Sequence, residues 1–311
     1  MMRSKRFAAY VVVGSLLFLF AACQISLDTS ESSPNPTEVV VRPTLRPTEK
    51  KQPTITPTQK PFINKTKYGH IREDEIWQDE MFVVGDIIVE EGVTLTIKPG
   101  TTVYIAANQD VKNMVDDPFD LQIGIAQVDH TDRGVHLGEP FRDEGNHISI
   151  IVLGKLMAVG TPDKKITITS SSANPTKYDW NKLRIENGKV VHAIIEYYRA
   201  IDMGHNVEIT NSELRHIGEC GVCIYGPALL EGNHLWDAGH ELIGTLGTPM
   251  IINNLFGPFP VRYAIIVGGG SPTIRGNTFE GCGGAVYIIG PSTPTIEDNV
   301  YINTRHKITY P

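Results

Sequence analysis

Apolar and polar positions alternate in short runs along the C-terminal third of the chain, and the alternation repeats at a nearly constant interval. The phrases PTIRGNTF (272–279) and PTIEDNVY (294–301) stand 22 residues apart. Extending this interval upstream aligns a column of polar residues, spaced by 21, 21, 23 and 22: Ser212, Asn233, Asn254, Asn277 and Asn299. A fixed period of this length predicts a repeat architecture.

Apolar columns flank the polar one. Three residues before it stand Ile209, Leu230, Ile251, Ile274 and Ile296, and two residues after it stand Leu214, Leu235, Phe256, Phe279 and Tyr301. A second set of columns, two residues apart, begins at Val222 and Ile224. This spacing is the alternation of a β-strand. Each strand is closed by a glycine, at Gly226, Gly247, Gly269 and Gly290, where we expect a turn with unusual backbone angles.

The runs are short, β-branched and separated by Pro-Thr and Gly, whereas helical repeats are longer and have 3.6-residue periodicity. An all-β, parallel β-helix with about 22 residues per coil fits the pattern. Its coils would stack about 4.8 Å apart, so that identical columns lie over one another. Stacked amides can donate to one coil and accept from the next. We therefore expect a structural ladder of Asn233, Asn254, Asn277 and Asn299.

Two β-rich runs precede these repeats, FVVGDIIVEEGVTLTIKPGTTVYI (82–105) and ISIIVLGKLMAVGTPDKKITITS (148–170). The order of GVTLTIKPGT, GKLMAVGT, ITITS and then Trp180 resembles the start of secreted and surface right-handed β-helix proteins with pectate-lyase-like repeats, over about residues 76 to 311. The resemblance implies a right-handed parallel β-helix. It leaves the function open, because these proteins include polysaccharide-degrading enzymes, adhesin-like proteins and members of no known activity.

The N-terminus predicts where the protein works. Basic residues precede an apolar run over 7–22, which is short for a membrane span. The run ends in LFAAC, which resembles a bacterial lipoprotein signal with Cys23 as the lipidated first residue of the mature chain. Residues 1–23 would then be a signal peptide, and the protein would be anchored by lipid to a bacterial membrane and exposed at the cell surface. The alternatives are a secretory signal cleaved elsewhere and an uncleaved anchor.

Composition separates a tether from a folded domain. Between residues 24 and 60, proline alternates with Thr, Glu, Lys and Arg, and aromatic residues are absent. Such a segment cannot bury a core, so we expect a disordered tether over 24–66 and a β-helix domain over 67–311. The net charge is −7, and no basic cluster is combined with aromatic residues, which argues against a nucleic-acid partner.

Three cysteines lie in the predicted domain. Cys220 and Cys282 are three coils apart, roughly 14 Å at the spacing of stacked strands, beyond the ~7 Å that a disulfide allows between Cα atoms. Cys220 and Cys223 lie in or beside a strand, where an odd offset directs side chains to opposite faces. We therefore expect buried free thiols at all three positions.

One column of the repeats carries ionisable side chains and supplies the candidate ligand-binding residues: Glu219, His240, Arg262 and Arg305. His216, His234, Asp237 and Glu241 lie beside it. In a carbohydrate-binding strip, Arg262 would hold an acidic sugar, while Asp237 or Glu241 would bind a cation or move protons. Asp237, His240, Glu241 and Arg262 are accordingly the candidate catalytic residues. The alternative is a solvated face of paired charges, because the acidic triplet typical of β-helix lyases is missing.

A long insertion over 106–147 interrupts the repeats. It is crowded with acidic residues and histidines, interleaved with apolar ones. An insertion of this size leaves the coil as a loop, and we expect it to cover the solenoid as a flap. Because Asp-rich loops supply hard oxygen ligands, the sharper hypothesis is a Ca²⁺ site with Asp116, Asp117 and Asp120 as candidates.

These observations favour a lipid-anchored surface protein whose β-helix binds extracellular or cell-wall polysaccharide, or a partner surface, without catalysis. A polysaccharide lyase or glycoside hydrolase on the same scaffold is the main alternative, and a structural or adhesive module is the third. The sequence ends on the apolar strand residues Ile308 and Tyr310, and an uncapped coil exposes strand edges. We therefore also expect self-association, or docking of a partner, at the C-terminal coil.

Overall fold

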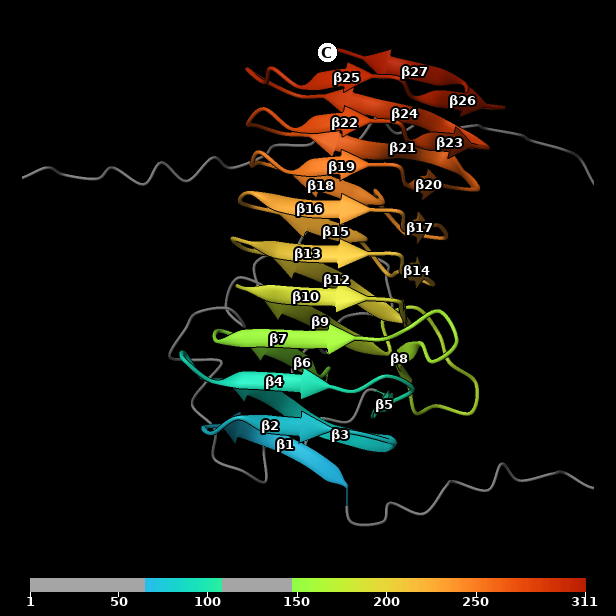
Figure 1. Cartoon of the computed structure of the whole chain (residues 1–311). Helices are drawn as coiled ribbons and strands as arrows, with labels where there is room; N and C mark the ends of the chain where they lie inside the picture. Colours follow the sequence, from blue (N-terminus) through green and yellow to red (C-terminus); the bar gives the residue numbers. More distant parts are fainter. Residues whose placement is uncertain (1–64, 108–146) are drawn as a thin grey trace, which may run out of the picture. The chain divides into compact units, whose positions relative to one another are not determined.

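The computed structural model describes residues 65–107 and 147–311, and these form a parallel β-solenoid of nine coils (Figure 1). All 27 strands pair in parallel with strands of neighbouring coils, and no helix occurs in these ranges. The predicted signal peptide with Cys23, nearly all of the predicted tether, and the candidates Asp116, Asp117 and Asp120 lie outside the described residues.

Each coil contributes one strand to each of three faces. The first face is a sheet of nine strands, which Figure 1 shows stacked in chain order. Its strands are β2 (Glu75–Trp77), β4 (Thr94–Ile97), β7 (Lys155–Val159), β10 (Gly188–Val191), β13 (Val207–Thr210), β16 (Ala228–Glu231), β19 (Met250–Ile252), β22 (Thr273–Arg275) and β25 (Thr295–Glu297). The columns that the sequence predicts are in register here, since Ile209 pairs with Leu230 and Leu230 with Ile251.

The second face follows the first along each coil. It consists of β5 (Thr102–Ile105), β8 (Ile166–Ser170), β11 (Ala193–Glu196), β14 (Glu213–Arg215), β17 (His234–Leu235), β20 (Leu255–Phe256), β23 (Thr278–Glu280) and β26 (Val300–Ile302). Its apolar column also stacks as predicted, with Leu235 against Phe256 and Phe256 against Phe279. The rings of these two phenylalanines stack with centroids 5.1 Å apart.

The third face closes the coil. It consists of β6 (Ser149–Val152), β9 (Trp180–Ile185), β12 (Tyr198–Met203), β15 (Val222–Ile224), β18 (Ile243–Thr245), β21 (Phe259–Val267), β24 (Cys282–Ile288) and β27 (His306–Thr309). At the first coil, β3 (Glu80–Val89) pairs with β5 through its early residues and with β6 through its late ones, and β1 (Thr66–Ile71) pairs with β3. The strand β3 therefore spans two faces.

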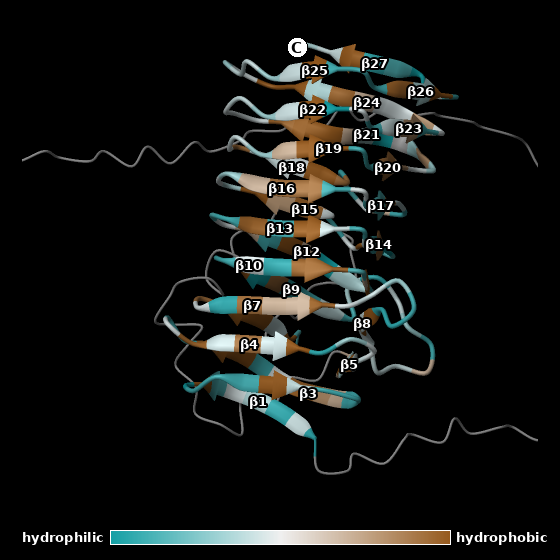
Figure 2. Ribbon diagram, viewed as in Figure 1, coloured by the Kyte–Doolittle hydropathy of each residue, from teal (hydrophilic) through white to brown (hydrophobic). Residues whose placement is uncertain are grey.

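A continuous apolar core runs inside the three faces. Alternate residues of each strand point inward, and hydrophobic stretches recur along the stacked strands from β3 to β24 (Figure 2). The largest fully buried side chains are Trp77, Trp180, Tyr198, Phe256 and Phe279. The indole nitrogen of Trp180 donates to the carbonyl of Glu196 at 3.0 Å. In the part of the chain that the structure describes, no helical segment has the length and apolarity needed to traverse a bilayer.

The asparagine column forms a buried ladder in the corner between the first and second faces. Asn254 Oδ1 accepts from the backbone N–H and from Nδ2 of Asn233, at 2.9 and 3.0 Å. Asn254 Nδ2 donates to the carbonyl of Leu230 and to Oδ1 of Asn277, both at 3.0 Å. Asn277 repeats the pattern with Asn299, and Ser212 N–H donates to Asn233. Each amide thus satisfies backbone groups that the strand pairing leaves unpaired.

At Gly226, Gly247 and Gly269 the glycine column does not have the predicted cause, a turn with unusual backbone angles. None of these three residues has a positive φ value. A Cβ atom at Gly247 would instead lie 2.6 Å from the carbonyl oxygen of Gly226 in the preceding coil. Close approach between coils therefore requires glycine there. In the next coil it is Gly270, with φ of 74°, that stacks over Gly247, rather than Gly269.

The prediction for Cys220 and Cys223 is wrong, because these residues form a disulfide with their Cα atoms 6.4 Å apart. The prediction applied strand alternation across the pair, but β15 begins only at Val222. Cys220 lies in the corner before the strand, where alternation does not hold. Cys282 is a buried free thiol, as predicted, and burial raises its pKa to about 11.

Candidate functional site

Three polar or aromatic residues occupy the corner between the second and third faces in successive coils. Tyr197 and His216 directly follow β11 and β14, and Asp237 follows Trp236 after β17. Their φ angles are 66°, 53° and 58°, in the left-handed region. Gly281, with φ of 60°, holds the same corner two coils after Asp237. Aspartate and histidine are enriched among the non-glycine residues at such angles, whereas tyrosine is uncommon there, and strained residues of that kind concentrate at functional sites.

These residues and Lys177 form what we call the corner cluster. Asp237 accepts from Lys177 Nζ at 2.6 Å through Oδ1 and contacts His216 Nδ1 at 2.8 Å through Oδ2. The rings of Tyr197 and His216 stack with centroids 5.0 Å apart and an interplanar angle of 12°. Lys177 comes from the segment between β8 and β9, 60 residues before Asp237. The cluster therefore joins three consecutive corners to a more distant loop.

The electrostatics of the corner cluster favour an ionised Asp237. Burial raises the pKa of this carboxyl, but the hydrogen bonds and charges of Lys177 and His216 outweigh it, so the net pKa lies below the ordinary value of 3.8. For Tyr197, burial and then the nearby Glu196 carboxylate raise the phenol pKa above 10.0. At neutral pH the cluster thus contains an anionic carboxylate beside a cationic lysine and a neutral tyrosine.

The adjoining part of the second face carries a strip of alternating charge and aromatic rings. Arg215 Nε donates to Glu196 at 2.7 Å, and the Arg215 guanidinium lies over the ring of Trp236, 5.6 Å from its centroid. The rings of His234 and Trp236 stack with centroids 4.0 Å apart. Trp236 and His234 are half-buried. We call this set, together with the corner cluster, the corner strip.

The sequence candidates divide between two places. Asp237 belongs to the corner cluster, with His216. His240 and Glu241 instead contact each other and lie beside the Cys220–Cys223 disulfide, at the edge of the third face.

The predicted ligand-binding column is likewise not a free strip. Glu219 pairs at 2.6 Å with the buried Arg199, and the backbone N–H of His240 donates to the Glu219 carbonyl at 3.2 Å. Arg262 and Arg305 are exposed farther along the solenoid. Glu219 and His240 therefore stack in neighbouring coils, as the column predicts. The Glu219 carboxylate, however, is already paired with Arg199 within the fold.

Five residues of the corner strip are not among the sequence candidates: Lys177, Glu196, Tyr197, Arg215 and Trp236. The column alignment started at Ser212, while Tyr197 lies in the coil before it. That coil is shorter, since Glu196 and its hydrogen-bonded partner Arg215 are only 19 residues apart. The repeat extended upstream by this shorter coil places Tyr197 in the same column as His216 and Asp237. Lys177 lies in an irregular segment, and no periodic signal marks it.

The corner strip can bind a ligand through two kinds of contact. Half-buried ring faces offer apolar surface for the C–H groups of a sugar, and tyrosine and tryptophan also have polar atoms at their edges. Lysine, arginine and carboxylate groups offer hydrogen bonds to hydroxyl or acidic groups. The Asp237 carboxylate also fixes the orientation of the His216 ring, as an acid–base pair requires.

Comparison with known proteins agrees with the fold. A family model described as "Right handed beta helix region" matches residues 200–310, so the chain contains a β-helix domain. This match spans β13 to β27 and includes Arg215, His216, Trp236 and Asp237. No curated protein and no solved structure matches the chain. The match concerns the fold, and a β-helix alone does not specify an activity.

Proposed function

We propose that this protein is a lipid-anchored, extracytoplasmic surface protein whose β-helix binds extracellular or cell-wall polysaccharide without cleaving it. The corner strip carries the proposal, because it gathers half-buried aromatic rings and charged groups on neighbouring coils of a rigid scaffold. Ligand sites of this kind combine apolar surface with a few convergent polar groups. The location rests on the LFAAC sequence, with lipidation at Cys23.

The arrangement favours binding over catalysis. The Asp237 carboxylate accepts from Lys177 and contacts His216, and Arg215 is shared between Glu196 and Glu213. Charges that are paired within the protein are held in place for recognition but are poor proton acceptors. In the corner cluster, the lowered pKa of Asp237 also makes it a weak base at neutral pH. A rigid and ionised surface suits recognition of a hydroxylated or charged polymer.

A glycan array probed with the purified full chain tests the proposal. We expect binding to at least one polysaccharide, and Trp236→Ala should lower the affinity about tenfold or more, the loss expected for an aromatic anchor. Tyr68→Ala is the matched control, because Tyr68 is a 51% exposed aromatic residue in the first coil, away from the strip. Equal losses in both variants, or no binding to any glycan, would contradict the proposal and favour a structural or adhesive module.

Cleavage of polysaccharide is the second candidate function, and the His216–Asp237 contact is the observation that favours it. A carboxylate that orients a histidine can support proton transfer to or from a bound sugar. Any glycan that binds should therefore be incubated with the protein and assayed for new reducing ends, or for the ultraviolet absorbance of an unsaturated sugar. If products form, Asp237→Asn should abolish them while binding persists. Intact glycan after prolonged incubation would support binding alone.

A further inference from the structure

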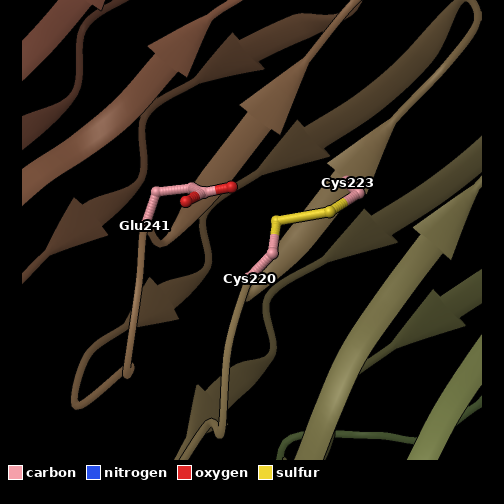
Figure 3. A group of neighbouring side chains, drawn as sticks. All are labelled: Cys220, Cys223 and Glu241. Carbon is pink, nitrogen blue, oxygen red and sulfur yellow. A yellow bond between two sulfur atoms is a disulfide. The ribbon is translucent and has the colours of Figure 1, made fainter. Parts of the chain in front are cut away.

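A group of potential metal donors surrounds the Cys220–Cys223 disulfide on the third face. The sulfur atoms of Cys220 and Cys223 and a carboxylate oxygen of Glu241 all lie within 4.8 Å of one another. Glu241 belongs to the next coil, and its carbonyl accepts from Gly221 N–H at 2.9 Å. Figure 3 shows its carboxylate directed toward the two sulfur atoms. Stacking of two coils thus brings a C-x-x-C pair and a carboxylate together.

The fold keeps space for these donors. Gly244 is the register partner of Cys223, and a Cβ atom on Gly244 would lie 3.0 Å from Glu241 Oε1 and 3.5 Å from Cys220 Sγ. A side chain at this outward position would compete with the donor atoms. On the other side of the carboxylate, His240 Nδ1 contacts Glu241 Oε2. One oxygen therefore faces the sulfurs while the histidine holds the other.

We propose that reduction of the disulfide opens a site for Zn²⁺, with Cys220, Cys223 and Glu241 as ligands and His240 positioning the carboxylate. Two thiolates spaced C-x-x-C and a carboxylate are ligand types that zinc accepts, and three protein ligands leave a fourth position for water. Carboxylates that ligate a metal are in turn hydrogen-bonded, and the His240 contact to the outer oxygen of Glu241 would supply that support. This inference does not depend on the proposed polysaccharide binding.

The chemistry balances with a dithiol reductant. The Cys220–Cys223 bond breaks as it takes up two electrons and two protons, and the reductant is oxidised to its own disulfide. Zn²⁺ then displaces the two thiol protons into the buffer as both sulfurs become ligands. Cys223 is only half-buried, whereas Cys220 is 4% exposed, so the thiolate of the reductant would attack at Cys223. Bound Zn²⁺ would in turn protect the reduced pair from oxidation.

Cobalt substitution tests the site with the full chain. After reduction and removal of the reductant without oxygen, one equivalent of Co²⁺ should give a thiolate-to-cobalt charge-transfer band, and Zn²⁺ should displace it. The oxidised protein should give no band. Cys223→Ser should lose the band, whereas Cys282→Ser should keep it, because Cys282 is a buried free thiol remote from the pair. Circular dichroism on each variant confirms that the fold is retained.

Two further variants distinguish this site from binding of the metal by the two thiols alone. His240→Ala should weaken Zn²⁺ affinity about 10- to 100-fold, as for other outer contacts to ligands, and Glu241→Gln at least as much. The proposal is overturned if the reduced protein gives no band, if the band survives Cys223→Ser, or if Glu241→Gln leaves the affinity unchanged. The Cys282→Ser protein should give the wild-type affinity, and a loss there would place the metal elsewhere.

Discussion

Replacing Asn254 by leucine should destabilise the β-helix, because the Asn254 amide serves groups in both neighbouring coils. The side chain is 2% exposed and makes four hydrogen bonds. In Asn254→Leu, the backbone N–H of Asn233 loses its partner at a position where water has no access. The Asn277 amide oxygen still accepts from the backbone of residue 254, and Asn233 Nδ2 still donates to Ile209.

The Leu230 carbonyl also loses the Asn254 amide as a donor, and the magnitude is worked from the Asn233 N–H, a buried donor that loses its acceptor. An orphaned buried donor costs about 1 to 3 kcal/mol, so we expect at least this loss in the free energy of unfolding, because the larger leucine side chain must also be accommodated in a close-packed corner. Asn254→Ser should cost less. Ser212, at the start of the same column, accepts the Ala193 N–H at 3.0 Å through its hydroxyl, which shows that serine can serve the ladder.

Two measurements check this reasoning. Urea unfolding followed by circular dichroism should give a lower midpoint for Asn254→Leu than for Asn254→Ser, and Asn187→Leu, in an exposed turn, should leave the midpoint unchanged. Native-state hydrogen exchange should show faster exchange of the Asn233 amide, since coils interact chiefly with their nearest neighbours. An unchanged midpoint together with unchanged protection of Asn233 would refute the role of the ladder.

Three further outcomes are expected. Cys23→Ala should release the protein from the membrane fraction or block its processing, and an unchanged mass in that fraction would exclude lipidation at Cys23. Ile308, which is 40% exposed on the last coil, should support self-association, so Ile308→Lys should lower the mass measured by light scattering; a wild type that is monomeric at high concentration would contradict this. Because the folded-state pKa of Asp237 is lowered, its ion pairs stabilise the fold above pH 3.8 and this contribution is lost as the pH falls through the lower, folded-state pKa. Asp237→Asn should therefore lower the melting temperature at pH 7 and have a vanishing effect in strong acid.

Most of the fold follows from the sequence because stacking repeats one local environment in every coil. Ile251 and Phe256 have counterparts at nearly constant intervals, and each counterpart proves to be its neighbour in the next coil. The sequence predicts the place of Asn254 for the same reason, since its amide lies in a buried corner and serves the coils on both sides. A column of identical residues therefore predicts both register and burial.

The candidate site is less predictable from the sequence because it lies where the repeat is irregular. Tyr197 falls in a shorter coil, and Lys177 reaches Asp237 from a loop outside the repeat. The error at Cys220 has a similar origin, since strand alternation was applied to a corner residue. Regular strands have a period that can be seen in the sequence, whereas corners change chain direction by an amount that depends on each coil.

The same stacking that creates the ladder also constrains what the corner strip can recognise. Tyr197, His216 and Asp237 stand one per coil along the solenoid axis, at the spacing of about 4.8 Å set by strand pairing. A ligand that lies along this axis contacts two rings and then a carboxylate. A ligand that lies around one coil instead contacts Trp236 and extends away from the corner cluster. Contact with all three corners requires a ligand about 10 Å long along the axis, which is two spacings of about 4.8 Å, so under the proposed function the geometry favours at least two linked sugar units over a single one.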